Sequence, residues 1–434
     1  ILVAAIIVTI VVVVCTRNKS DATYTVTFDS NGGTAVDSLT DVAHNSRISE
    51  PSAPTRLGYV FGGWYKQKEL ADKWRFNRDR VTADITLYAK WNYAATLGLQ
   101  MELKAGGTYT VTGIGSVTDN VIVVPSVHEG LPVTAIGREA FAQNGNITAV
   151  ILPDSVVSID SRAFYGCTAL TEAELPKSVN AFGEFVFDGC KNLVKVNLPE
   201  NMTMLPKHTF NGCHSLAAIQ FPSTLKTISE RAFYECRKLT NFTLPNSLET
   251  IEVNAFSGCH TLTSVNIPAT VKNIGTRAFS NCVSIDTLTV AKGNINYYSE
   301  GNCIISFGKL IIGCKSSVIP QEVTVIGEGA FQGCQGLERI DSGDHVASLR
   351  GITAIEDYAF MGCSSLKNVI IPTSVVSIGE GAFDSCEALA TVSFSEAEHS
   401  KLKTIGKEAF AHCAVTSIRL PIVLSLECRR VLFR

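Results

Sequence analysis

The side chains best suited to chemistry in this chain of 434 residues are its regularly spaced cysteines. Ten of the 14 cysteines stand three residues after a phenylalanine: Cys167, Cys190, Cys213, Cys236, Cys259, Cys282, Cys334, Cys363, Cys386 and Cys413. A thiolate can bind zinc or act as a nucleophile. Zinc sites usually hold cysteine pairs separated by roughly two to four residues, and the sequence has no such pair. We therefore expect no metal site and no cofactor.

A catalytic cysteine needs a neighbouring base and a lowered pKa. Histidine stands beside cysteine in Cys213-His214, Cys259-His260 and His412-Cys413. Adjacent residues in a turn usually point apart, and a cysteine that recurs at a fixed spacing is explained better by packing. No glycine-rich phosphate loop, nucleophile elbow or pair of catalytic carboxylates stands out either. We expect no catalytic residues and no enzyme activity in this chain.

Two acidic stretches contain histidine and could in principle bind a cation. They are Asp341-Ser342-Gly343-Asp344-His345 and Glu396-Ala397-Glu398-His399. The two stretches fall two repeats apart and do not obviously converge. We interpret both as solvated turns.

The cysteines belong to a repeat of about 23 residues that must build the fold. Its phenylalanines are Phe141, Phe164, Phe187, Phe210, Phe233, Phe256, Phe279, Phe331, Phe360, Phe383 and Phe410. Five residues before each lies a large apolar residue: Ile136, Ile159, Phe182, Leu205, Ile228, Ile251, Ile274, Ile326, Ile355, Ile378 and Ile405. A fixed period of roughly 20–29 residues is typical of a solenoid. Stacked repeats share a core that one copy cannot bury alone.

Each repeat contains one clear strand pattern, Leu-x-x-apolar-x-apolar, which a proline usually ends. Leu170 to Leu175 and Leu262 to Ile267 follow this pattern. Proline ends the strand because it lacks the N–H that a sheet needs. The Ile-Gly-x-x-Ala-Phe half of each repeat is expected to fill the core from the opposite wall.

Parallel stacking of these strands would place successive repeats about 4.8 Å apart. That spacing fits the Cα separation of a disulfide, but parallel Cβ atoms would lie slightly too far apart. We favour free, buried thiols that pack as small apolar groups, with disulfides between repeats as the alternative. Free cysteines in an exported protein would fit a reducing environment.

The outward positions of the predicted strands are polar and almost uncharged in the middle repeats. We propose them as a partner-binding concave face: Asn197, Gln220, Asn241, Thr243, Ser264, Asn266, Thr287 and Thr289. Such a surface suits hydrogen bonding to a protein or a glycan. It is equally consistent with the soluble face of a sheet that binds nothing.

Three insertions break the period, and insertions in solenoids form loops that often lie on a binding face. The largest falls near residues 291–320, between Phe279 and Phe331. Within it, Cys303 to Ile312 has the pattern of a β-hairpin that turns at Gly308. The other two insertions fall at the acidic stretches described above.

The two ends of the chain differ from the repeats. Residues 1–15 are almost all apolar, which predicts part of a signal peptide or a membrane anchor, although a span needs about 20 residues. Alternatives are a lipoprotein site at Cys15 or a buried strand or helix. Residues 422–434 resemble the translation of a sequencing-library adapter, with Cys428 as the one departure. We expect a non-native tail there, or else an unusual cap.

Residues 24–92 have a different pattern, with alternating strands around Asn31-Gly32-Gly33, Gly63-Trp64-Tyr65 and Leu87-Tyr88-Ala89-Lys90-Trp91. This segment resembles the internalin-type B-repeat, also called the Listeria–Bacteroides repeat. The resemblance implies a small β-grasp-like module of surface proteins, often a spacer. Core packing is the expected role of Trp64 and Trp91, with a ligand platform as the alternative.

Residues 98–421 resemble the BspA-like, or type 5, leucine-rich repeats of bacteria. The motifs Ile274-Gly275-Thr276-Arg277-Ala278-Phe279 and Leu366-Lys367-Asn368-Val369-Ile370-Ile371-Pro372 carry this resemblance. It implies a horseshoe-shaped solenoid of parallel strands with an irregular or short helical convex side. The expected order is an apolar membrane segment at 1–15, a linker at 16–23, the B-repeat at 24–92, a cap at 93–132 and repeats at 133–421.

The net charge of −3 argues against a nucleic-acid partner, which requires a basic surface. The family resemblance implies a bacterial cell-surface protein, secreted or membrane-anchored, that mediates adhesion or recognises an extracellular protein or glycan. The membrane would be contacted through the N-terminal segment. The alternatives are an envelope spacer without a specific ligand and the non-catalytic part of a longer surface enzyme.

Overall fold

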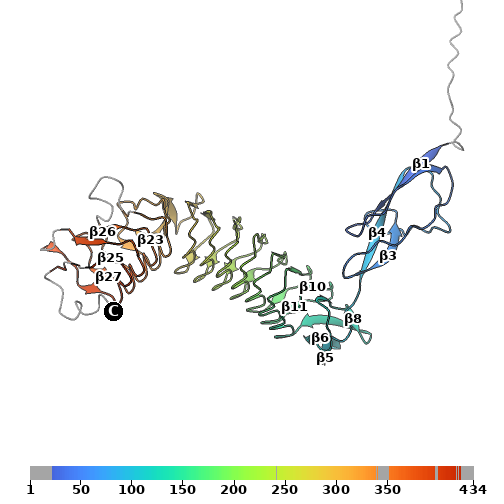
Figure 1. Ribbon diagram of the computed structural model, residues 1–434, viewed down its shortest axis with the longest axis horizontal. Helices are drawn as coiled ribbons and strands as arrows, with labels where there is room; N and C mark the ends of the chain where they lie inside the picture. Colours follow the sequence, from blue (N-terminus) through green and yellow to red (C-terminus); the bar gives the residue numbers. More distant parts are fainter. Residues whose placement is uncertain are drawn as a thin grey trace, which may run out of the picture. The chain divides into compact units, whose positions relative to one another are not determined.

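The computed structural model describes residues 22–240, 242–338, 340, 351–395, 399–416, 418 and 420–421. The predicted membrane segment, the tail at 422–434 and the acidic stretch at Asp341 to His345 lie outside these residues. The chain divides into two compact units, and the division falls between Ala95 and Thr96. Figure 1 shows both units and labels some of their strands.

The first unit is a four-stranded mixed sheet in the order β2 (Leu39–Ala43), β1 (Thr23–Asp29), β4 (Ile85–Tyr93) and β3 (Tyr59–Tyr65). The central pair β1 and β4 is parallel, and both outer pairs are antiparallel. No helix occurs among residues 22–95, and the β-grasp comparison stays a prediction.

Tryptophan packing explains the motifs of this first unit. Trp64 is fully buried and lies edge-on to Phe28, with ring centroids 4.8 Å apart. Trp91 donates a hydrogen bond from Nε1 to the Ser30 carbonyl at 3.0 Å. A Cβ at Gly33 would lie 2.4 Å from the Trp91 ring, so this turn requires glycine. Trp64 is therefore a core residue, as expected, and Trp91 is partly buried and packs against that core.

The second unit is a solenoid, and its predicted Leu-x-x-apolar-x-apolar strands form a first strand column. Its members are β7 (Val121–Val123), β10 (Ala149–Ile151), β12 (Glu172–Glu174), β14 (Lys195–Val196), β18 (Ser264–Ile267), β20 (Thr287–Val290), β26 (Asn368–Ile371) and β28 (Thr391–Phe394). These strands form three sheets, β7 to β14, β18 with β20, and β26 with β28. Within each sheet, neighbouring strands pair in parallel, and each residue lies beside its equivalent in the next repeat. The prediction of a parallel-strand solenoid is confirmed.

The apolar residue five before each phenylalanine forms a second strand column, which the sequence pattern did not predict as strand. Its members are β6 (Thr108–Gly113), β9 (Leu131–Ile136), β11 (Ser158–Ile159), β13 (Ala181–Phe182), β15 (Met204–Leu205), β16 (Thr227–Ile228), β17 (Thr250–Ile251), β19 (Asn273–Ile274), β24 (Val325–Ile326), β25 (Ala354–Ile355), β27 (Ser377–Ile378) and β29 (Thr404–Ile405). In most repeats, only two residues of this strand pair with the strand of the next repeat. Such short strands give weak periodicity in the sequence.

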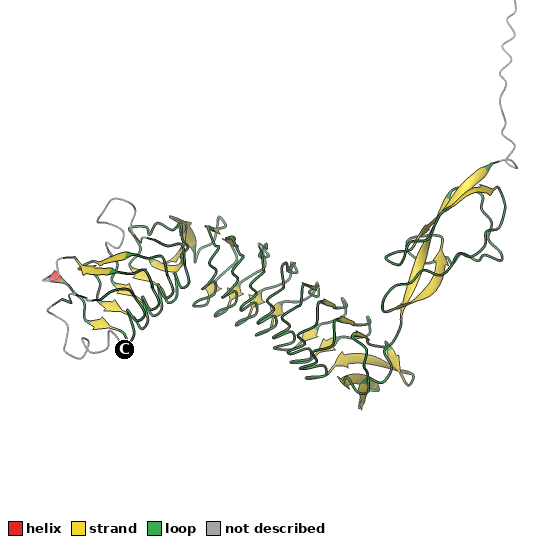
Figure 2. Ribbon diagram, in the orientation of Figure 1, coloured by secondary structure: helices red, strands yellow, loops and turns green. Residues whose placement is uncertain are grey.

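A third wall is made of the turns around the phenylalanines. Each turn bonds to the next through the backbone, as from Phe233 N to Ala255 O at 2.8 Å. The phenylalanine rings stack with centroids 5.0–5.7 Å apart along the solenoid. Figure 2 draws this wall as loops, and no described residue from 22 to 338 is helical. Of the two predicted forms, the wall is irregular rather than helical.

The solenoid begins with a hairpin that covers its first core layer. Strand β5 (Gln100–Lys104) pairs antiparallel with β6, and β6 continues in parallel to β9. The short strand β8 (Val127–His128) also pairs with β9. The hairpin thus pairs with β9, the strand that would otherwise form the open edge of the second strand column at its first repeat.

The largest insertion forms the expected hairpin. Strands β21 (Tyr298–Glu300), β22 (Cys303–Ser306) and β23 (Lys309–Ile312) are antiparallel, and β22 turns into β23 at Phe307 and Gly308. Strand β23 then pairs in parallel with β24. The buried residues form one cluster mainly before this insertion and another mainly after it, and the phenylalanine stack is interrupted between Phe279 and Phe331.

Candidate interaction surface

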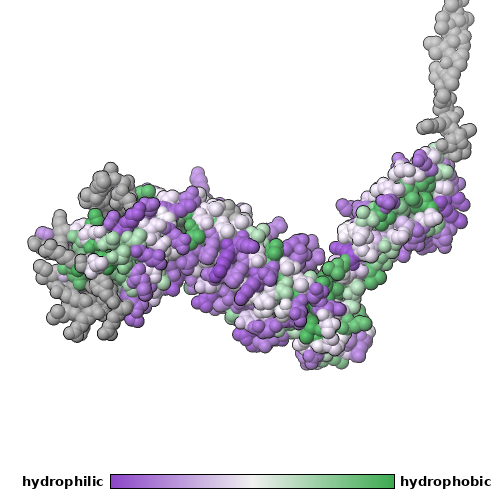
Figure 3. Space-filling model, viewed as in Figure 1, coloured by the Kyte–Doolittle hydropathy of each residue, from purple (hydrophilic) through white to green (hydrophobic). Residues whose placement is uncertain are grey.

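The structure describes seven of the eight residues of the predicted face, and Asn241 lies outside the described residues. Exposed side chains are those of Asn197, Gln220, Thr243, Asn266, Thr287 and Thr289, whereas Ser264 is half-buried. The apolar residues between them, such as Val265 and Leu288, are buried. The alternation of a half-buried strand therefore holds in these repeats. The face seen in Figure 3 is mainly hydrophilic over the middle repeats.

Three of these side chains already hydrogen-bond within the solenoid itself. The Asn197 amide accepts a hydrogen bond from Leu175 N at 2.8 Å and donates one to Leu175 O at 2.6 Å. It therefore extends the pairing between β12 and β14. Thr289 donates to Asn266 Oδ1 at 3.1 Å across the β18–β20 pair. These contacts leave Gln220, Thr243 and Thr287 as the more available polar groups.

The first strand column is interrupted between β14 and β18 in the described residues. Phe221 and Phe242 lie there at positions that smaller aliphatic residues occupy in most repeats. Their rings meet edge-on at 5.5 Å and are only partly buried. Gln220 and Thr243 consequently stand on irregular backbone, so the seven described residues of the face do not share one continuous sheet. Their action as one binding face stays a prediction.

The cysteine repeat has a structural explanation. Nine of the ten repeat cysteines donate a hydrogen bond from Sγ to the carbonyl of the phenylalanine one repeat earlier, at 3.0–3.4 Å. A buried carbonyl without a partner is costly, and a thiol is a small group that can supply a weak donor. The first repeat has no predecessor, and there Asn144 Oδ1 accepts from Asn146 N and Ile147 N instead.

All twelve described cysteines are free thiols, as predicted. Burial raises the pKa of Cys167 and of Cys363 to about 12, and it also raises the pKa of Cys190 and of Cys213 well above the usual value of a thiol. A thiol with a raised pKa is a poor nucleophile. These cysteines are therefore packing residues rather than catalytic ones.

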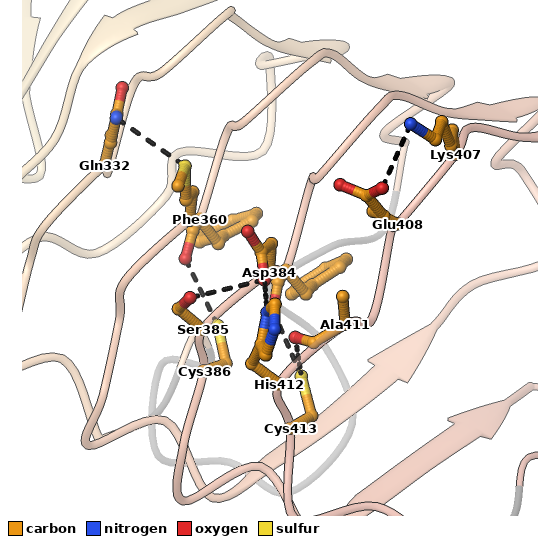
Figure 4. Close-up of polar contacts among 12 residues, drawn as sticks. Gln332, Phe360, Asp384, Ser385, Cys386, Lys407, Glu408, Ala411, His412 and Cys413 are labelled. Atoms are coloured by element: carbon orange, nitrogen blue, oxygen red, sulfur yellow. Dashed lines mark hydrogen bonds and ion pairs between the residues drawn. The ribbon is translucent and has the colours of Figure 1, made fainter. Parts of the chain in front are cut away.

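Cys413 differs from the other repeat cysteines, and Figure 4 shows its surroundings. It is only half-buried, and interaction with the neighbouring Cys386 thiol lowers its pKa. The neighbouring His412 Nδ1 lies 2.8 Å from Asp384 Oδ1, and this contact raises the pKa of His412. Among the described residues, His412-Cys413 is the one sequence pair of histidine and cysteine whose thiol is not fully buried.

We expect Cys413 to react first when the folded protein is treated with iodoacetamide at pH 8. Its lowered pKa gives more thiolate than the buried thiols, whose raised pKa keeps them protonated. Peptide mass spectrometry after short labelling measures the order, with Cys363 as the buried comparison. Equal labelling of the two cysteines would contradict this assignment.

A regular stripe of large side chains was missed by sequence reasoning. It occupies the position two before the phenylalanine, where the backbone has positive φ: Glu139, Arg162, Phe185, His208, Arg231, Asn254, Arg277, Tyr358 and Glu408. A non-glycine residue there costs about 1–2 kcal/mol. Contacts along the stripe offset this cost: the Phe185 and His208 rings stack at 4.5 Å, and Arg277 lies 4.3 Å from the Tyr358 ring centre. The recurring large residues at this position were the available sequence clue.

Within the described residues, no group of three or more histidine, cysteine, aspartate or glutamate side chains is placed to hold a metal ion. His399 lies in the described part, but the acidic residues before it do not. The same described part contains no helix that is both long and apolar enough to cross a membrane.

The comparisons with known families cover most of the solenoid. The model of the BspA type leucine-rich repeat region matches residues 134–248, 226–304 and 306–427. The chain belongs to the BspA-type leucine-rich repeat family. The Listeria–Bacteroides repeat model matches residues 24–90, which accounts for the first unit.

One solved structure supports this assignment. The leucine-rich cell surface protein of Faecalibacterium prausnitzii is 27% identical, with a TM-score of 0.54, and the match covers 70% of this chain and 94% of that one. Among sequence relatives, a Gly-rich membrane protein of Evansella cellulosilytica is 46% identical over 68 residues, which are 16% of this chain and 8% of that protein. Internalin H of Listeria monocytogenes is 44% identical over 84 residues, which are 18% and 15% of the two chains. The matches therefore cover only a small part of these two relatives.

Proposed function

We propose that this BspA-type protein acts on the bacterial surface and recognises an extracellular protein or glycan through the first strand column, as an adhesin would. The observation that carries the proposal is the exposure of the uncharged polar side chains of Gln220, Thr243, Asn266, Thr287 and Thr289. The last three of them alternate with buried apolar residues, Val265, Ile267 and Leu288. Uncharged polar groups are desolvated at lower cost than charges. The surface location is supported by the similar proteins, one of which is named as a cell surface protein and another as a Gly-rich membrane protein. A membrane contact through residues 1–15 belongs to the same proposal.

The expected affinity of one copy is low. Interface affinity comes mainly from buried aromatic and arginine anchors, and this set of side chains contains neither. Many copies on one cell would multiply the attachment through effective concentration. An envelope spacer remains the second candidate function, because Asn197, Asn266 and Thr289 already hydrogen-bond within the solenoid.

Replacing Thr243, Asn266 and Thr289 together by lysine should reduce attachment of displaying cells to matrix protein or partner cells about tenfold. All three side chains are exposed, so the change should spare the fold while adding charges that a polar partner cannot pair. Cell-attachment counts at matched surface expression measure the effect.

The comparison variant replaces Asp341, Asp344 and His345 by alanine. If only this variant lowers attachment, binding belongs to the acidic insertion and the first-column proposal is wrong. If neither variant changes attachment, the spacer function is favoured.

A further inference from the structure

Backbone pairing in the second strand column follows one rule. In each repeat, the carbonyl of the apolar residue five positions before the phenylalanine accepts a backbone hydrogen bond. The donor is the N–H of the residue that follows the equivalent apolar residue in the next repeat. Gly275 N, for example, donates to Ile251 O at 2.7 Å, and Gly379 N donates to Ile355 O at 2.8 Å. Each repeat thereby closes the strand edge of the one before it.

The rule fails at β19, where the largest insertion begins. Tyr297 replaces part of the missing strand, because its hydroxyl accepts the hydrogen bond from Ile274 N at 2.8 Å. No N–H within the described residues donates to Ile274 O. Strand β19 is therefore an open parallel edge that presents one backbone acceptor. The Tyr297 hydroxyl keeps its own proton for a second partner.

A groove of about 320 Å³ lies along this edge. Its floor contains Ile251, Ile274 and the buried Tyr297, and the exposed Val253 lines it. Two acidic side chains, Glu230 and Glu252, also line it. Glu230 is paired with Lys207 at 3.3 Å, whereas Glu252 Oε2 accepts only a backbone hydrogen bond, from Glu230 N at 2.8 Å. The Glu252 carboxylate thus gives the groove a negative charge.

A second groove provides a contrast. It lies at β13, where Pro206 lacks the N–H that would pair with Phe182 O, and it is lined by both Arg138 and Asp160. Its charges are mixed, and the next repeat is present there but carries proline at the pairing position. Of these two grooves, the one at β19 combines an open acceptor, a hydroxyl proton and a net negative charge.

We propose that the open edge of β19 binds an extended peptide segment that carries lysine or arginine. A peptide N–H would donate to Ile274 O, and the Tyr297 hydroxyl would donate to a peptide carbonyl, as in strand addition to a sheet edge. The cationic side chain would meet Glu252, and an apolar neighbour would cover Val253. This surface is distinct from the first strand column and does not rest on its proposed function.

The proposal is tested with immobilised pentapeptides of sequence Thr-Val-X-Val-Thr, in which X is each of the 20 common amino acids, probed with the dye-labelled full chain. We expect Lys and Arg spots to retain about tenfold more protein than Asp and Glu spots. Methylation of the backbone nitrogens should remove this retention. Uniform retention across all spots, or binding that survives backbone methylation, would overturn the proposal.

Matched variants locate the binding. Glu252→Gln keeps an acceptor for Glu230 N but removes the charge, and it should abolish the preference for Lys and Arg. Asn273→Trp should fill the groove and abolish binding without removing a described hydrogen bond. Glu356→Gln is the control, because Glu356 makes the equivalent bond to Glu328 N at 2.9 Å beside a closed edge. A Glu252→Gln protein that still prefers cationic spots, or an equal loss in Glu356→Gln, would place the peptide elsewhere.

Discussion

Phe233→Ala should lower the free energy of unfolding of the solenoid by about 3–5 kcal/mol. The Phe233 side chain is fully buried, and its ring lies 5.3 Å from that of Phe210 and 5.1 Å from that of Phe256. Truncation would leave a cavity next to both neighbouring repeats. Because a solenoid is stabilised by contacts between adjacent repeats, both interfaces of this repeat would weaken.

Urea unfolding followed by far-ultraviolet circular dichroism measures this loss. All three tryptophans lie in the first unit, so their fluorescence follows that unit separately. Phe307→Ala is the matched control, since its ring is 87% exposed at the hairpin turn. Its effect should stay within about 0.5 kcal/mol. Similar losses in both variants would show that the stacked rings are not the source of stability.

Gly313→Val should be nearly as damaging, because it affects the junction between the two core clusters. A Cβ at this position would lie 2.1 Å from Phe331, and that ring is buried and stacked on Phe360 at 5.0 Å. The ring cannot move away without breaking its own stack. Overpacking of this kind costs about 1–3 kcal/mol and sometimes more. We expect the second half of the solenoid to unfold at lower urea, in a separate transition.

Gly336→Val provides the control for this change. Its Cβ would approach only the Lys315 side chain, at 3.2 Å, and that flexible chain can move into solvent. The variant should therefore unfold in one step close to the parent protein. A single shared transition in both variants would mean that Gly313 does not control the coupling of the two halves.

The sequence determined the parts of this protein that each repeat specifies for itself. The spacing of Phe233 and Cys236 predicted a buried ring and a buried free thiol, because identical neighbours in a stack must fill identical places. The apolar pattern from Cys303 to Ile312, with glycine at 308, predicted the hairpin. The weak net charge argued against a nucleic-acid partner, and the lack of closely spaced cysteine pairs argued against a metal site.

Only the tertiary structure decided how neighbouring repeats use their polar groups. The sequence could not show that Asn197 is occupied by the backbone of Leu175, because that contact joins different repeats. The sequence also did not show that the Ile274 carbonyl lies unpaired at the edge of a sheet. The insertion displaces the strand that would pair with it, and only the structure shows that displacement. Periodicity reports which residues are buried. Hydrogen bonds between repeats, which decide where the surface is open, depend on the register that stacking creates.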